Sequence, residues 1–100
     1  MQKLILQFAE NHPTGAGHFP GNPIIPGALL LAEVLKLISN AANIRLAACH
    51  VQTAKFQHPA RPGDRLDIEY DCSANLVIHF KCAVAGQTVL SGVISATLDT

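Results

Sequence analysis

Charged residues are scarce in this chain: Asp, Glu, Lys and Arg together make up 14% of its 100 residues. A typical soluble domain carries about 25%. The seven basic residues balance the seven acidic ones, so the chain lacks the basic excess of a nucleic-acid-binding protein, and we expect no nucleic-acid partner. Hydrophobic residues reach 49%, which excludes intrinsic disorder. Because so little charge covers the surface of a small domain, we infer that some apolar surface is buried against another subunit.

Cysteines are few and odd in number: Cys49, Cys72 and Cys82. Their spacing is not that of a disulfide framework and is more typical of a reducing compartment. Long apolar runs are also missing. The longest, residues 24–32, is interrupted by a Pro-Gly pair and is shorter than the roughly 20 residues that span a bilayer. No signal peptide is visible at the N-terminus, so we predict a cytoplasmic protein with no membrane partner.

The length fits one domain, covering residues 1–100. Residues 3–8 can form a short strand. Four prolines and three glycines between residues 10 and 26 exclude regular structure there, and the apolar residues among them predict a shaped loop packed on something.

A helix follows, with Pro26 in its first turn and an end near residues 40–43. Its polar residues, Glu33, Lys36 and Asn40, recur at spacings of three and four and make one narrow stripe. Nearly all other positions are apolar, so the helix is expected to be buried on most sides.

After the helix the hydrophobic period changes to two, which predicts strands at about 65–72, 76–84 and 90–98, and a less regular one within 44–57. Turns are predicted at 61–64, 73–75 and 85–87. Cys72 and Cys82 fall on the apolar phases of their strands, so both are predicted to be small core residues. This order predicts an α+β domain in which an antiparallel sheet wraps around one central apolar helix.

The most informative stretch is residues 18–29, which read His-Phe-Pro-Gly-Asn-Pro-Ile-Ile-Pro-Gly-Ala-Leu. Residues 55–66 form a second block, Lys-Phe-Gln-His-Pro-Ala-Arg-Pro-Gly-Asp-Arg-Leu. The first block resembles the signature of the 3-hydroxyacyl-acyl carrier protein dehydratases of the FabA/FabZ type, and the second resembles a later segment of that family. The resemblance implies a hot-dog fold and a dimer formed by edge-to-edge pairing of the sheets, with an acyl-thioester pocket at the interface. It also implies a substrate on acyl carrier protein or CoA in fatty-acid, related lipid or polyketide synthesis, and no cofactor.

The same resemblance assigns roles to residues of the first block. His18 matches the base that removes the α-proton of the 3-hydroxyacyl thioester, and an imidazole can accept a proton near neutral pH. Gly27 matches the residue whose backbone N–H points at the thioester carbonyl, at a helix start where amides are unpaired. The substrate-binding positions that this implies are Phe19, Pro26, Ala28 and Ala32.

The sequence departs from the family at the general acid. The family's Asp or Glu lies fourteen residues after the histidine, and here that position is Ala32, which has no proton to give. Glu33 is a candidate replacement, but one residue along a helix turns a side chain by about 100°, and Glu33 belongs to the polar stripe.

Several alternatives therefore stay open. A heterodimer with a related hot-dog subunit would bring the acid from the partner, whereas a homodimer would lack it. Alternatively, dehydration is lost and the chain is a non-catalytic acyl-thioester-binding protein. An acyl thioesterase is a third choice, which Ala32 also disfavours. The other histidines, at positions 12, 50, 58 and 79, are interpreted as structural or exposed, and without zinc-like spacing we expect no metal site.

Overall fold

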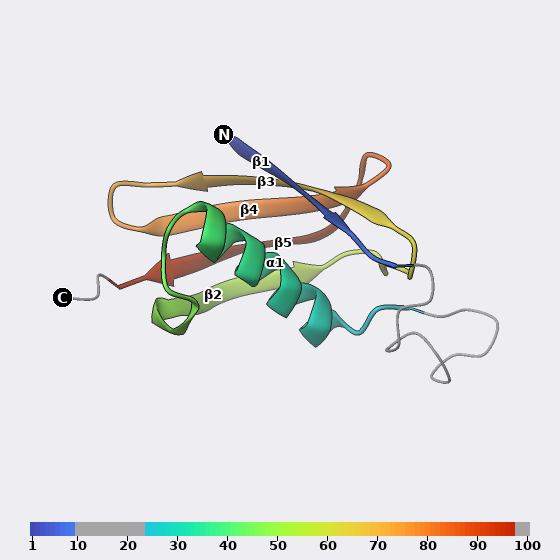
Figure 1. Cartoon of the computed structure of the whole chain (residues 1–100), viewed down its shortest axis with the longest axis horizontal. Helices are drawn as coiled ribbons and strands as arrows, with labels where there is room; N and C mark the ends of the chain where they lie inside the picture. Colours follow the sequence, from blue (N-terminus) through green and yellow to red (C-terminus); the bar gives the residue numbers. More distant parts are fainter. Residues whose placement is uncertain (10–23, 98–100) are drawn as a thin grey trace.

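An α-helix lying against a five-stranded sheet forms the body of the protein (Figure 1). The computed structural model describes residues 1–9 and 24–97. In chain order the elements are β1 (Gln2–Gln7), α1 (Gly27–Ala41), the 3₁₀ turn η2 (Leu46–Ala48), β2 (Cys49–Phe56), β3 (Arg65–Cys72), β4 (Val77–Val84) and β5 (Gln87–Ala96). This order confirms the predicted α+β class.

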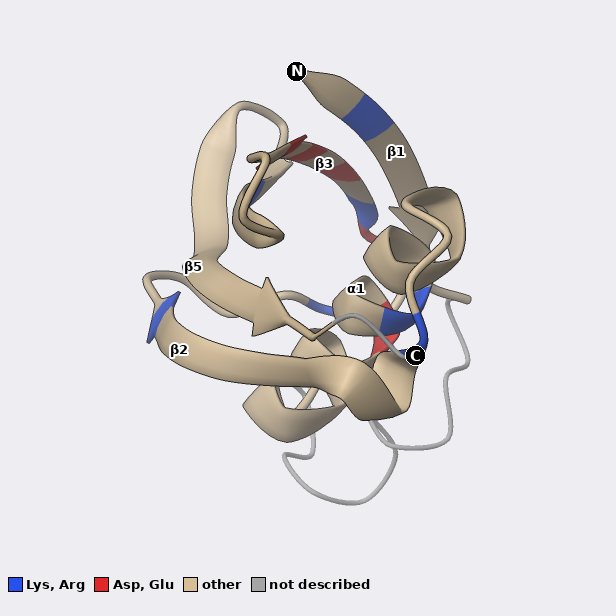
Figure 2. Ribbon diagram, turned by 90° about the vertical axis from the view of Figure 1, so that its left-hand side faces the viewer, with Lys and Arg blue, Asp and Glu red and all other residues tan. Residues whose placement is uncertain are grey.

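The strands lie in the order β1-β3-β4-β5-β2, and every neighbouring pair is antiparallel. Strands β3, β4 and β5 follow one another as hairpins, while β2, which follows the helix, pairs with β5 at one edge. In the end-on view of Figure 2 the strands curve around α1. The helix α1 runs along the curved sheet (Figure 1). The last residue of β2, Phe56, lies against Gly27, where α1 begins.

The core lies between one face of α1 and the concave face of the sheet. Leu30, Val34 and Ile38 recur every four residues, so they share one face of the helix, and all three are buried. Strands β3 and β4 contribute alternate residues, as the period of two predicts, whereas β5 buries the adjacent residues Val89 and Leu90. Those buried on β3, β4 and β5 are Leu66, Ile68, Tyr70, Ile78, Phe80, Cys82, Val89, Leu90 and Ile94. Each large side chain buried here contributes about 1.5–3 kcal/mol to folding.

The prediction that Cys72 is a core residue is wrong. Cys72 is exposed, whereas Cys82 is buried as predicted. Cys72 is the last residue of β3, and its Sγ lies 3.6 Å from the carbonyl oxygen of Ser73, where the turn to β4 begins. The alternation of β3 therefore continues in the sequence past the point where neighbouring elements cover the strand.

Turn geometry explains two shifted boundaries. The sequence places Leu76 in a strand and Gln87 in a turn. The structure gives Leu76 a φ of 58° in the turn before β4, and Gln87 begins β5. The hairpin between β4 and β5 turns on Ala85 and Gly86 alone, with φ values of 50° and 83°, as expected of a two-residue hairpin loop.

The expectation that α1 is buried on most sides is met only in part, because the sheet covers one side of it. Ala28 and Ala32 are exposed, and Leu35 is half-buried. The edge strand β2 is also uncovered, with Val51 45% and Phe56 51% exposed. In the described part of the chain, no helix is long and apolar enough to cross a membrane.

Candidate functional site

The N-terminal end of α1 presents unpaired amides. Pro26 is the N-cap residue, with φ −56° and ψ 140°. The first hydrogen bond of the helix runs from the Leu30 N–H to the Pro26 carbonyl at 3.0 Å. The N–H groups of Gly27, Ala28 and Leu29 precede that bond, and the described residues provide no acceptor for them. Such a helix end favours a carbonyl oxygen or another group that develops negative charge.

Gly27 lies directly against an aromatic ring. A Cβ placed on Gly27 would be 3.1 Å from Phe56 Cε1 and 3.3 Å from Phe56 Cζ. This contact is tighter than an ordinary van der Waals separation of about 3.5–4.0 Å. Glycine at this position therefore lets the end of β2 approach the helix start, which brings the two sequence blocks of residues 18–29 and 55–66 together.

A pocket of about 260 Å³ opens at this junction. Its walls come from both blocks: Ile24, Ile25, Gly27 and Leu30 on the helix side, and Phe56, Gln57, His58, Pro59 and Ala60 on the other. Apart from His58, these lining residues carry no ionisable side chain. The pocket thus combines a largely apolar wall, free backbone donors and one imidazole, a composition that suits an apolar chain ending in a polar carbonyl group.

Main-chain hydrogen bonds hold the wall of this pocket in place. The Ile25 N–H donates to the Ala60 carbonyl at 2.7 Å, which joins the helix entry to the segment after β2. The Gln57 N–H donates to the Val89 carbonyl at 2.9 Å, which continues the pairing of β2 with β5. Residues 57–60 are therefore fixed at both ends, although most of their side chains are exposed.

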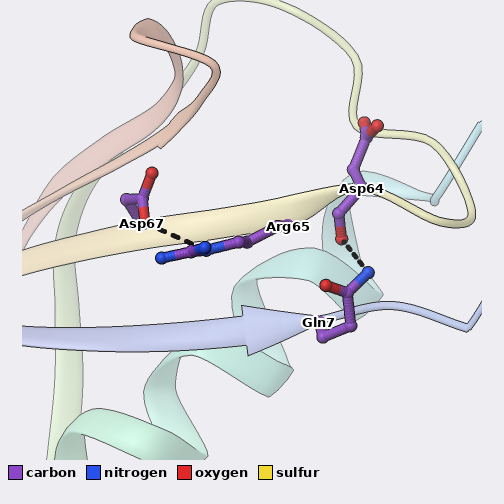
Figure 3. A network of polar contacts seen from close by, with 4 residues as sticks. All are labelled: Gln7, Asp64, Arg65 and Asp67. Atoms are coloured by element: carbon purple, nitrogen blue, oxygen red, sulfur yellow. Dashed lines mark hydrogen bonds and ion pairs between the residues drawn. The ribbon is translucent and has the colours of Figure 1, made fainter.

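The following turn is tied to β1. Gln7 at the end of β1 donates from Nε2 to the carbonyl oxygen of Gly63 at 2.9 Å. It also donates to the carbonyl oxygen of Asp64 at 3.4 Å, the contact drawn in Figure 3. Asp64 in turn accepts the Arg61 N–H on Oδ2 at 2.7 Å. On β3, Arg65 Nε lies 3.5 Å from Asp67 Oδ1, an ion pair between two exposed side chains (Figure 3). These contacts confirm the predicted turn at 61–64 and stabilise the far end of the pocket wall.

The site residues that the sequence predicts differ in where they lie relative to the pocket. His18 and Phe19 lie outside the described residues. Gly27 lines the pocket, whereas Pro26 caps the helix beside it and Ala28 is exposed in the first turn.

Neither candidate position for the acid lines this pocket. Ala32 follows Gly27 by five residues, which places it about 140° around the helix, and its side chain is exposed. Glu33 forms an ion pair with Lys36, with Nζ 3.5 Å from Oε1, as the polar stripe predicts. A carboxylate at position 32 of one chain would therefore point away from the pocket of that same chain.

His58 is the residue that the sequence interpretation underrated. It is exposed, as predicted, but its ring lines the pocket, and its Nδ1 lies 2.9 Å from the carbonyl oxygen of Thr88 on β5. The signal was its place in the second block, two residues after the Phe56 that meets Gly27. Proximity to β5 could not be inferred, because it depends on the sheet order.

A larger hollow, of about 490 Å³, lies at the other end of α1 among Lys36, Asn40 and Arg45. Carbonyl groups rather than amides are unpaired at a helix C-terminus, and neither of the two sequence blocks contributes a residue to that hollow. The described residues contain no group of three or more His, Cys, Asp or Glu side chains placed to hold a metal ion.

Comparison with known proteins places the fold among hot-dog domains and then identifies the family. An uncharacterized protein from Erwinia carotovora subsp. atroseptica superposes with a TM-score of 0.74 at 25% identity, over 95% of this chain and 81% of that one. The dehydratase heterocomplex ApeI:P from Xenorhabdus doucetiae superposes with a TM-score of 0.71 at 22% identity, over 96% and 86%. The second likeness, at that identity, concerns the fold alone.

Sequence relatives give the family. The model of the ApeI-like family, described as ApeI dehydratase, matches residues 1–93. A 3-hydroxyacyl-(acyl-carrier-protein) dehydratase FabZ of Wolbachia sp. subsp. Drosophila simulans (strain wRi) is 32% identical over 97% of this chain and 76% of its own length. The FabZ of Ehrlichia chaffeensis (strain ATCC CRL-10679 / Arkansas) is 39% identical over 56% of this chain and 43% of its own length, so that match spans less than half of the relative. The chain belongs to the ApeI-like dehydratase family, within the FabA/FabZ type of hot-dog proteins.

Proposed function

We propose that this protein acts on 3-hydroxyacyl thioesters as a dehydratase, or on the corresponding enoyl thioesters in the reverse direction. The observation that carries the proposal is the convergence of the two family blocks on one pocket beside the first amides of α1. The substrate class follows the family, with the acyl group on a carrier protein or on CoA in fatty-acid, related lipid or polyketide synthesis. The apolar wall suits the acyl chain, and the pocket requires no cofactor for a proton-transfer reaction.

In this proposal the Gly27 N–H binds the thioester carbonyl. Removing the α-proton places negative charge on that oxygen, and a preorganised donor at a helix start stabilises this charge more in the transition state than in the ground state. His18 is proposed as the base that takes the α-proton, a role that rests on the family resemblance. Phe19 and the helix residues Pro26, Ala28 and Ala32 are proposed as further substrate contacts.

A dimer is proposed from the two uncovered apolar surfaces. The exposed flank of α1 around Ala28 and Ala32 and the exposed edge strand β2 both lie on the outside of the single chain. Pairing of sheets at an edge strand satisfies its unpaired backbone groups and covers apolar side chains such as Val51. In such a dimer, residue 32 of one chain faces away from the pocket of its own chain. A carboxylate at that position would then be free to contribute to the pocket of the other chain.

The direct test is turnover of a crotonyl thioester by the purified chain, followed through the loss of absorbance of the conjugated double bond. His18→Ala should abolish turnover while circular dichroism shows an intact fold, and His79→Asn, at an exposed histidine of β4, is the matched control. Glu33→Gln should be nearly silent because Glu33 pairs with Lys36. An unchanged rate in His18→Ala would refute the assignment of the base.

A second candidate function rests on Ala32. With alanine at the family's acid position, this chain would serve as the partner subunit of a heterodimer whose other chain supplies the carboxylate, or as a non-catalytic acyl-thioester-binding protein. The Xenorhabdus neighbour is named as a dehydratase heterocomplex. Ala32→Glu tests this role: a rise in homomeric turnover indicates that the missing carboxylate limits the rate. If only a mixture with an acid-bearing hot-dog chain turns over, the partner-subunit role is correct.

A further inference from the structure

We propose that His58 donates the proton to the departing hydroxyl group, in place of the carboxylate that is absent at position 32. This inference rests on the proposed function and names a residue that would complete the same site. Its basis is local: among the described residues that line the pocket beside Gly27, only His58 has an ionisable side chain. The neighbouring charged residues Lys55 and Arg61 do not line it.

The hydrogen bond of His58 determines which ring nitrogen is available. Nδ1 lies 2.9 Å from the Thr88 carbonyl oxygen, and a carbonyl oxygen only accepts, so Nδ1 carries a proton in both charge states of the ring. The proton that the ring gains or loses is therefore the one on Nε2. The described residues provide no hydrogen-bond partner for Nε2, which leaves it available to a substrate in the pocket.

Hydrogen bonds fix the backbone around His58, and a proton donor requires such a fixed position. Gln57 is bonded to Val89 and Ala60 to Ile25, and the ring itself is bonded to β5. Three bonds thus orient one exposed imidazole before any substrate arrives, which lowers the entropy cost of reaching a reactive geometry. The exposed position also lets the ring exchange protons with solvent between turnovers.

The proton balance closes with two imidazoles. The α-C–H bond breaks and its proton passes to the base, proposed as His18. The electron pair forms the double bond between Cα and Cβ as the Cβ–O bond breaks. The His58 imidazolium gives its Nε2 proton to the leaving hydroxyl, which departs as water. The base ends protonated and His58 ends neutral, and solvent restores both. In hydration the same residues act in reverse.

The test measures kcat/KM for dehydration against pH in the wild-type chain, His58→Asn and the control His79→Asn. Asn at position 58 keeps an N–H that can reach the Thr88 carbonyl but cannot ionise. We expect His58→Asn to lose about 10²- to 10⁴-fold in kcat/KM, the usual contribution of a positioned acid, and to lose the fall in rate at alkaline pH. The control should keep both. Imidazole added to the buffer should partly restore the rate of His58→Ala.

Each result decides the matter. Wild-type turnover with an unaffected His58→Asn overturns the role of His58 and leaves the proposed function intact. A slow His58→Asn that keeps the alkaline fall, with no rescue of His58→Ala by imidazole, overturns proton donation in favour of a positioning role. Turnover that requires an acid-bearing partner chain overturns the His58 inference but not the family activity. No turnover in either form overturns both proposals.

Discussion

Replacing Gly92 with alanine should cost this protein much of its stability. Gly92 lies in β5 between Ala54 of β2 and Phe80 of β4. A Cβ at this position would be 2.4 Å from the Thr53 carbonyl oxygen and 2.8 Å from Phe80 Cζ. The first distance is about 1 Å shorter than an ordinary contact, and the atom concerned is backbone, so β2 itself has to move.

Overpacking of this kind costs typically 1–3 kcal/mol and occasionally more. Because both a strand and a buried ring obstruct the new methyl group, we expect about 3 kcal/mol. That is a large fraction of the roughly 5–15 kcal/mol that stabilises a domain of this size. At about 4–8 °C per kcal/mol, the midpoint of thermal unfolding should fall by roughly 12–24 °C.

The matched control is Gly86→Ala in the turn between β4 and β5. Gly86 has a φ of 83° and no atom within 4 Å of a new Cβ, so only backbone strain of about 1–2 kcal/mol applies. Urea unfolding of both variants gives the comparison. Adding Phe80→Leu to Gly92→Ala should not restore stability, because the clash with Thr53 persists. A smaller loss in Gly92→Ala than in Gly86→Ala would refute the reasoning.

Three further outcomes follow from the described contacts. Gln7→Ala should lower the free energy of unfolding by about 1 kcal/mol, since it removes the side-chain hydrogen bond to Gly63. It should also speed amide hydrogen exchange in residues 57–64, and unchanged exchange would contradict the role of Gln7 in holding that segment. Cys72 should react with an alkylating reagent in the folded protein, whereas Cys82 should react only on unfolding. Cys82 is 0% exposed, and burial raises its pKa to about 12. Mass spectrometry of the labelled peptides measures the difference. The unfolded Cys82 thiol ionises from its ordinary pKa of 9.0 while the folded thiol stays protonated, so stability should fall with rising pH between about 9 and 12, by about 1.4 kcal/mol per pH unit for this group. Cys82→Ala should lack that part of the slope in urea titrations, and identical slopes would contradict it.

Periodicity alone was enough to predict the elements and most of the core. Leu66, Ile68 and Tyr70 alternate with charged residues, and the structure buries all three. The same pattern was wrong for Cys72, because alternation records which side of a strand is apolar and not where neighbouring elements stop covering it. Turn residues were similarly misplaced by one position at Leu76 and Gln87, since their assignment depends on φ values that neighbouring strands impose.

The candidate site shows the same difference between features that are local in the sequence and contacts that depend on the fold. The Pro-Gly pair at residues 26 and 27 predicted the helix start, and the two motif blocks predicted the family, because both are local in the chain. That Phe56 packs on Gly27, and that His58 reaches Thr88, could not be inferred from either block. Those contacts arise because β2 crosses to the far edge of the sheet and pairs with β5. The sequence by itself determined the chemistry that the two blocks carry, and only the tertiary structure, through the strand order, decided which side chains share a pocket.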